Sequence, residues 1–182
     1  MSDFNWYEFY KDKIGESWYY GEITVRQPEI KAVSEFKSVL GVGSGRCIVE
    51  DYLSKVMFAV ASDLSRKLLV AAKSRHGNLQ HYVCCDAFYL PFRDKAFDCV
   101  YSQGFMEHFD DAEVVLIVDE MVRVGETVLF FIPLPAYRNP SLGVEHRRTL
   151  DAWTKLLSMY PKVDTGCYEE PMGPIGGVTV KG

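Results

Sequence analysis

The segment of this chain best suited to chemistry is a short run of glycines. It reads Gly41-Val42-Gly43-Ser44-Gly45 and lies between a strand-like and a helix-like pattern. Glycines at 43 and 45 let the backbone turn tightly and approach a ligand with no side chain in the way. The helix that follows offers free N–H groups and a partial positive charge. The pattern predicts a bound anion or carboxylate, although a plain strand-to-helix turn explains a glycine pair as well.

Two aspartates follow later strand-like runs at corresponding points. Asp63 comes 20 residues after Gly43, where a carboxylate can accept hydrogen bonds from both ribose hydroxyls of a nucleoside. Asp86 can accept from an adenine amine, and the N–H of Ala87 can reach a ring nitrogen. Structural interpretations also exist, with Asp63 as a helix N-cap and Asp86 as a turn residue before Pro91. Because the ends of parallel strands meet at one rim, the three positions together favour a nucleoside site.

The elements that must position these residues alternate from about residue 37 onward. Helices are predicted where apolar residues recur every three or four positions, and strands where short apolar runs occur. The predicted strands are 38–42, 56–61, 81–85, 97–101, 127–132, 163–168 and 177–180. Such alternation predicts an α/β protein with a doubly wound, mostly parallel sheet. The stretch between the third and fourth strands is short for a crossover helix and contains Pro91.

Composition and charge narrow the class of protein. The 182 residues are 48% hydrophobic and 25% charged with a net charge of −5, which is typical of one globular domain. No apolar run is long enough to span a membrane, and the start does not resemble a secretory signal, so we expect a cytoplasmic protein. Basic residues do not cluster beyond 146–148, which argues against a nucleic-acid partner.

The cysteine pattern argues against a metal site. The five cysteines are odd in number and contain no C-x-x-C spacing, so the four ligands of a zinc site are missing. Cys84, Cys85 and Cys99 lie in strand-like runs. They are expected to be free, buried thiols in a reducing compartment.

Four blocks of the sequence together resemble a class I S-adenosylmethionine-dependent methyltransferase of the small type-11 family. They are Ser38–Gly45 (SVLGVGSG), Ser62–Leu64 (SDL), Cys85–Phe109 (CDAFYLPFRDKAFDCVYSQGFMEHF) and Asp119–Pro133 (DEMVRVGETVLFFIP). From the first block to the last they span residues 38–133, which is about half of the chain. The resemblance implies a Rossmann-like, seven-stranded sheet whose last strand is antiparallel. It also implies S-adenosyl-L-methionine as the cofactor.

The resemblance assigns roles to individual residues. The implied cofactor-binding residues are Gly43, Ser44, Gly45, Asp63, Leu64, Asp86, Ala87, Ser102 and Gln103. The glycine loop would lie against the methionine portion, Asp63 would bind the ribose, and Leu64 would pack near the adenine. Asp86 and Ala87 would contact the adenine edge, while Ser102 and Gln103 would face the transferable methyl group.

Glu107 and His108 are the candidate general bases. They follow the fourth predicted strand on the rim to which the methyl group should point, and a base is needed when the acceptor arrives protonated. Neutral histidine titrates near the working pH. The competing interpretations are a structural histidine at 108 and a solvated glutamate at 107.

Two departures from the family pattern keep an alternative open. Gly41 stands where the family usually has an acidic residue, and Cys47 where it usually has a glycine. A catalytically degenerate S-adenosylmethionine-binding module with a regulatory or partner-binding role is the alternative. A nicotinamide-binding protein is a further alternative, but its G-x-G-x-x-G fingerprint would need a third glycine at Ile48.

The acceptor and the N-terminal segment are less constrained. Ser102–Phe105 (SQGF) replaces the Asn/Asp-Pro-Pro-aromatic tetrad seen in enzymes that methylate exocyclic amines of bases or glutamine amides. We therefore expect a small-molecule acceptor, and the sequence indicates no oligomeric state. Eight of the 25 aromatic residues lie in the first 20. Residues 1–36 are interpreted as a lid or cap over the domain formed by residues 37–182, with a helix packed on the core or a dimer surface as the alternative.

Overall fold

The computed structural model describes residues 5–11, 16–138 and 143–182. Its helices are α1 (Trp6–Tyr10), α2 (Glu16–Val25), α3 (Gln27–Val33), α4 (Ile48–Leu53), α5 (Arg66–Lys73), the short 3₁₀ helix η1 (Met106–His108), α6 (Asp111–Val124) and α7 (Leu150–Leu156). Its strands are β1 (Ser38–Val42), β2 (Phe58–Asp63), β3 (His81–Cys84), β4 (Phe97–Gln103), β5 (Gly125–Pro133), β6 (Lys162–Glu170) and β7 (Gly173–Lys181).

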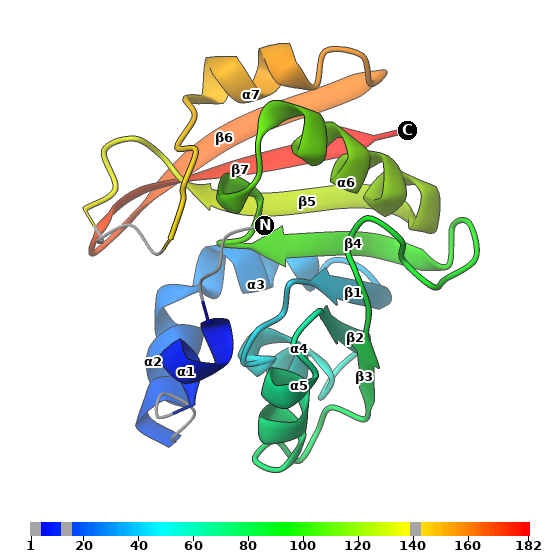
Figure 1. The fold of residues 1–182 in the computed structure, drawn as a ribbon, viewed down its shortest axis with the longest axis vertical. Coiled ribbons are helices and arrows are strands. Elements are labelled where there is room, and N and C mark those ends of the chain that lie inside the picture. Colours follow the sequence, from blue (N-terminus) through cyan, green and yellow to red (C-terminus); the bar gives the residue numbers. More distant parts are fainter. Residues whose placement is uncertain (1–4, 12–15, 139–142) are drawn as a thin grey trace.

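The strands form a single seven-stranded sheet in the order β3-β2-β1-β4-β5-β7-β6. The first five strands are parallel, and β7 runs antiparallel to both of its neighbours. This arrangement confirms the predicted fold class, including the antiparallel last strand. In register, Val42 is level with both Ser62 and Ser102, so β1, β2 and β4 end at the same rim. That rim faces the side on which α1 and α2 lie (Figure 1).

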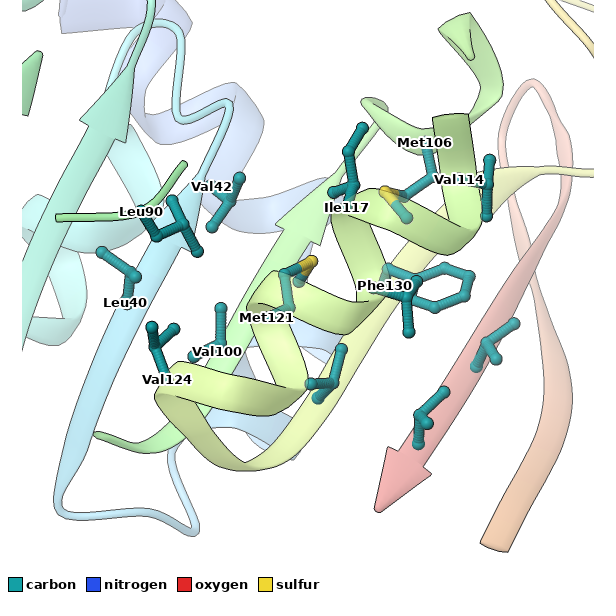
Figure 2. Packing of buried hydrophobic residues seen from close by; sticks show 14 of the residues in the cluster. Leu40, Val42, Leu90, Val100, Met106, Val114, Ile117, Met121, Val124 and Phe130 are labelled. Atoms are coloured by element: carbon teal, nitrogen blue, oxygen red, sulfur yellow. The ribbon is translucent and has the colours of Figure 1, made fainter. Parts of the chain in front are cut away.

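Two buried clusters fill the space between the sheet and its helices. On one face, α6 and α7 cover the sheet, and α6 inserts Ile117, Met121 and Val124 against the central strands (Figure 2). On the other face, α3, α4 and α5 pack over β1, β2 and β4. The capping box of Asp110 and Glu113 starts α6 and so fixes where its apolar stripe begins. Two rigid layers therefore hold the strand ends in place.

The connection between β3 and β4 contains no helix, in line with its short length and proline. Arg123 of α6 holds it instead by donating to the carbonyl oxygens of Leu90 (2.9 Å) and Phe92 (2.8 Å). The same guanidinium pairs with Asp94 at 2.9 Å. The middle of this connection is thus anchored to α6 without a crossover helix.

The N-terminal segment packs on the domain through α2. Ile23 lies in the buried cluster, and the hydroxyl of Tyr19 donates to Asp51 at 3.0 Å. Glu22 pairs with Arg46 at 2.6 Å, and this arginine follows the glycine loop. The segment is therefore tied directly to the glycine loop.

Three further features of the described ranges concern membranes, metals and thiols. None of the helices there is long and apolar enough to cross a membrane, and no group of three or more potential ligands could hold a metal ion in that same part of the chain. The cysteines are free, and Cys99 is buried while Cys84 is exposed. The expectation of a buried thiol is wrong for Cys84 because β3 is an edge strand.

Candidate functional site

A cavity of about 310 Å³ opens at the rim where β1, β2 and β4 end. All nine residues that the sequence singled out for a cofactor line this one cavity: Gly43, Ser44, Gly45, Asp63, Leu64, Asp86, Ala87, Ser102 and Gln103. Its size lies at the lower end of the range typical of ligand pockets. The N-terminal segment adds Trp6, Tyr10, Glu22 and Arg26 to the wall.

The glycine loop has a backbone that requires glycine at its centre. Gly43 adopts φ +67°, and a Cβ atom there would lie 2.3 Å from the ring of Phe105. Gly45 adopts φ +50°, and a Cβ there would meet nothing closer than 3.9 Å, which leaves the cavity open above it. Cys47, where the family usually has a third glycine, is buried and keeps the left-handed conformation at φ 54°. The side chain has changed at this position, but the glycine-like backbone remains.

Asp63 holds the loop to the end of β2. Its carboxylate accepts from the N–H of Gly45 at 2.8 Å and from the N–H of Ser65 at 2.7 Å. The N-cap of α5 is Ser65, so the interpretation of Asp63 as that cap was wrong by two residues. Burial raises the pKa of Asp63. A carboxylate has about four acceptor sites, so Asp63 can still accept ligand hydroxyls.

Glu50 of α4 is a site residue that the sequence reasoning missed. It is 3% exposed, and its Oε1 accepts from Ser44 Oγ and from the Tyr101 hydroxyl, each at 2.8 Å. Burial raises the pKa of this carboxyl. A Cβ atom at Gly41 would stand 1.9 Å from that Oε1. Glu50 therefore occupies the space that an acidic side chain at position 41 would fill.

Asp86, Ser102 and Gln103 complete the rim. Asp86 accepts from the N–H of Phe88 at 3.1 Å, so its turn role exists alongside its place on the cavity wall. Ser102 is 1% exposed, and its hydroxyl has no partner among the described residues. Gln103 donates through its amide nitrogen to Glu29 of α3.

The two candidate bases differ sharply in environment. Glu107 is 4% exposed, and burial raises its pKa to about 8. Its Oε2 has no hydrogen-bond partner within the described part of the chain. His108 contacts the carbonyl oxygen of Val144 through Nδ1 at 3.0 Å, and its ring lies 4.9 Å from that of Trp6. Burial lowers the pKa of His108, which favours a neutral imidazole.

A second, smaller cavity of about 110 Å³ adjoins the first. The residues that line both are Trp6, Tyr10, Arg26, Gln103, Gly104 and His108. Glu107 lines only the smaller one. The loop that closes it is attached to η1, because the N–H of His146 donates to the carbonyl oxygen of Glu107 at 2.6 Å. The site therefore consists of two adjoining cavities beyond the strand ends.

Comparison with known protein families gives a direct match. Residues 40–127, which run from β1 into β5 and include the glycine loop and both aspartates, match the family model described as a methyltransferase domain. The chain belongs to the S-adenosylmethionine-dependent methyltransferases. No curated protein matches it in sequence.

Solved structures support the fold of this methyltransferase at low sequence identity. A methyltransferase from Aquifex aeolicus that depends on S-adenosylmethionine shares 18% identity over 98% of each chain, with a TM-score of 0.72. A Pyrococcus horikoshii protein shares 19% identity over 96% of this chain and 99% of its own, with a TM-score of 0.75. The magnesium protoporphyrin IX methyltransferase of Synechocystis, with bound S-adenosylhomocysteine, shares 14% over 87% and 84%, with a TM-score of 0.68.

The larger cavity fits the family's cofactor. The glycine loop leaves room for a ligand above Gly45. The buried hydroxyl of Ser102 lies in the cavity wall and has no hydrogen-bond partner among the described residues. Carboxylates at Asp63 and Asp86 stand at successive strand ends and line the same space, where a nucleoside offers hydroxyl and amine donors. At the two departures noted in the sequence, the Glu50 carboxyl lies beside Gly41 and Cys47 keeps a left-handed backbone.

Proposed function

We propose that this methyltransferase holds S-adenosyl-L-methionine in the larger cavity and a small-molecule acceptor in the smaller one. The proposal rests on the convergence of Gly43, Asp63 and Asp86 on one cavity that shares part of its wall with a second. Bound there, S-adenosylmethionine supplies a methyl group on a positively charged sulfur, which is a strong electrophile. Most of the work left to the protein is alignment, which contributes about 7–11 kcal/mol in well-oriented reactions.

We assign the cofactor's parts to the residues that the family resemblance indicated, and their place on the wall of the larger cavity supports this assignment. Asp63 binds the ribose hydroxyls, with Leu64 beside the adenine and Asp86 and Ala87 at its edge. The loop from Gly43 to Gly45 holds the methionine portion at the start of α4. Glu50 orders this loop through its bond to Ser44, in the role that an acidic residue at position 41 has elsewhere in the family.

Glu107 is the better supported of the two candidate bases. It is buried in the wall of the smaller cavity with one carboxyl oxygen unpartnered, and a base with a raised pKa is better matched to an acceptor proton. His108 has its Nδ1 engaged by Val144 and stands between the two cavities. We assign it the role of shaping the passage between cofactor and acceptor.

The N-terminal segment serves as a cap over both cavities. Trp6 and Tyr10 of α1 line both of them, and the guanidinium of Arg46 lies 4.8 Å from the centre of the Tyr10 ring. The α2 part of the segment is instead a helix packed on the core, as Ile23 shows. The lid proposal therefore applies to α1. Residues 1–4 and 12–15 of the predicted segment lie outside the described residues.

Calorimetric titration tests the proposed function. Purified protein is titrated with S-adenosylmethionine, S-adenosylhomocysteine and NAD, and Asp63→Ala is compared with Asp164→Ala on the exposed face of β6. We expect binding of the two adenosyl ligands only, and at least about a tenfold loss of affinity, or ~1.4 kcal/mol, in Asp63→Ala but not in the control. Binding of NAD, or equal affinities in both variants, would contradict the proposal.

A further inference from the structure

The smaller cavity carries more negative than positive side chains. Its ionisable residues other than His108 and Tyr are Arg26, Glu29, Glu107, Glu145 and Arg147. Both arginines already have carboxylate partners: Arg26 pairs with Glu22 at 2.6 Å, and Arg147 pairs with Glu145 at 2.7 Å. Both positive charges on this wall are therefore paired with carboxylates that themselves line one of the two cavities.

Glu107 differs from the other carboxylates of this wall. Glu29 also has a buried Oε2 without a partner, but its Oε1 accepts from Gln103 and lies 3.4 Å from a guanidinium nitrogen of Arg26. Glu107 forms no ion pair within the described ranges, its Oε2 is unpartnered, and the side chain is almost fully buried. A buried carboxyl oxygen without a partner is costly, so a ligand that supplies a positive charge or a donor hydrogen at Oε2 would relieve that cost.

Aromatic rings on the same wall point to a cation. Trp6, Tyr10 and Tyr137 line the cavity, and the rings of Trp6 and Tyr10 are stacked at 5.9 Å. The faces of tryptophan and tyrosine attract ammonium groups by about 0.5–2 kcal/mol each when desolvated. Two of these rings already lie under guanidinium groups, with Arg46 at 4.8 Å from the centre of the Tyr10 ring and Arg147 at 6.0 Å from that of Tyr137. The aromatic contribution to an ammonium site beside Glu107 therefore rests on Trp6.

We propose that the acceptor is a small primary or secondary amine whose ammonium group binds against Glu107, and that its nitrogen is the atom methylated. This inference rests on the proposed function, because it assumes that the cofactor occupies the adjoining cavity. The basic nitrogen of such an amine differs from the conjugated amines whose methylating enzymes carry the tetrad absent at Ser102–Phe105.

The proton and electron balance is complete without a further reactant. The ammonium nitrogen gives one proton to the Glu107 carboxylate and so recovers its lone pair. The nitrogen then forms a bond to the methyl carbon as the carbon–sulfur bond breaks, and those two electrons stay on sulfur. The product is a methylated ammonium ion beside neutral S-adenosylhomocysteine. Because binding of the amine releases one proton to solvent, Glu107 keeps the proton that it accepts from the nitrogen when the product leaves, and so returns to the protonated state of the free protein.

The environment of Glu107 gives the proposal a readout that does not depend on turnover. Burial keeps its pKa at about 8 in the free protein, so the carboxyl is mostly protonated at pH 7. A cation bound against it stabilises the ionised form. Binding of an amine at pH 7 therefore releases up to about one proton to the buffer, which is measurable as a dependence of the binding enthalpy on the buffer's ionisation enthalpy.

The test uses the full chain saturated with S-adenosylhomocysteine and three matched pairs of probes. These are ethanolamine and glycolate, benzylamine and benzoate, and histamine and imidazole-4-acetate. We expect at least one amine to bind at least about tenfold more tightly than its carboxylate partner, with proton release, and to be methylated when S-adenosylmethionine replaces the product. Preference for carboxylates, or failure of every amine to bind, would overturn the inference.

Variants of Glu107 separate this inference from the proposed function. Glu107→Gln is expected to abolish proton release and to weaken amine binding at least about tenfold, while the affinity for S-adenosylhomocysteine stays within about twofold. Glu107→Asp retains part of the proton release, and Glu126→Gln on the exposed part of β5 changes nothing. If Glu107→Gln binds amines normally with the same proton release, the amine site is wrong. If the wild-type protein fails to bind S-adenosylhomocysteine, it is the proposed function that fails.

Discussion

A side chain at position 41 would compete with the Glu50 carboxyl for the same space beside the glycine loop. This competition allows a quantitative test of the role of Glu50. Gly41→Asp places its Cβ 1.9 Å from Glu50 Oε1 and 2.7 Å from Ser44 Oγ, so the native carboxyl must leave its site. Two carboxylates forced to about 4 Å apart repel each other by ~4 kcal/mol at an effective dielectric constant of about 20. We therefore expect Gly41→Asp to lower the free energy of unfolding by about 2–4 kcal/mol.

Glu50→Ala alone is expected to lower the free energy of unfolding by a similar amount, for a different reason. It removes the acceptor of two hydrogen bonds, those of Ser44 and Tyr101, and a buried donor left unsatisfied costs about 1–3 kcal/mol. The double variant Gly41→Asp with Glu50→Ala vacates the space and supplies a carboxylate from the other side. The double variant should therefore lose at least ~2 kcal/mol less free energy of unfolding than the two single variants lose together.

Urea unfolding of the four proteins measures this coupling, and calorimetry with S-adenosylhomocysteine measures its effect on binding. Gly41→Ala keeps the steric clash without the charge, and Glu50→Gln keeps the shape without the charge, so the two separate the contributions. The double variant should also recover most of the affinity lost in Glu50→Ala. Additivity within about 0.5 kcal/mol would refute the claim that Glu50 substitutes for an acidic residue at position 41.

Three further predictions concern the loop and the base. Gly43→Ala is expected to cost at least ~1 kcal/mol of stability and at least about tenfold in cofactor affinity, measured by unfolding and calorimetry, because φ is +67° and Phe105 blocks the new methyl. At Cys47, φ 54° suits glycine, so Cys47→Gly should change the free energy of unfolding by less than about 1 kcal/mol. Cys47→Val should be clearly more destabilising, because a β-branched residue rarely adopts this conformation. A urea titration in which Cys47→Gly is the less stable of the two variants would contradict this prediction. For Glu107, a folded pKa of about 8 lies above the unfolded value, so its stabilising contribution is present at low pH and is lost as the pH rises from about 4.5 to 8. The free energy of unfolding of Glu107→Gln should therefore rise relative to that of the wild type by up to ~5 kcal/mol across that interval. A difference between the two proteins that stays constant with pH would contradict a raised pKa for Glu107.

Much of the fold was predictable because buried parallel strands leave a strong signal. The bounds of β1 were predicted at both ends, since five residues with small or apolar side chains end in a glycine turn. The strand predicted at 56–61 instead begins at Phe58, because the N–H groups of Val56 and Met57 bond back to Leu53 and close the turn after α4. Such turn bonds have no periodicity from which they could be anticipated.

The site was predictable where topology alone determines it. Gly43, Asp63 and Asp86 meet because the carboxyl ends of parallel strands share a rim. Glu50 was not predictable in this way, because a glutamate in a helix is ordinarily solvent-exposed. A signal existed in hindsight: the acidic residue missing at position 41 reappears in the first turn of the next helix. Arg26 was missed because its place depends on how the N-terminal segment packs.

The wall shared by the two cavities has a consequence for the order of events. Since α1 contributes Trp6 and Tyr10 to both spaces, a ligand in one cavity restricts rings that the other ligand also contacts. Thermodynamic linkage then requires each ligand to change the affinity of the other by the same factor. The ligand that binds first thus changes the affinity for the second through the shared rings of α1. Independent binding of the two ligands would require α1 to keep the same position in every state.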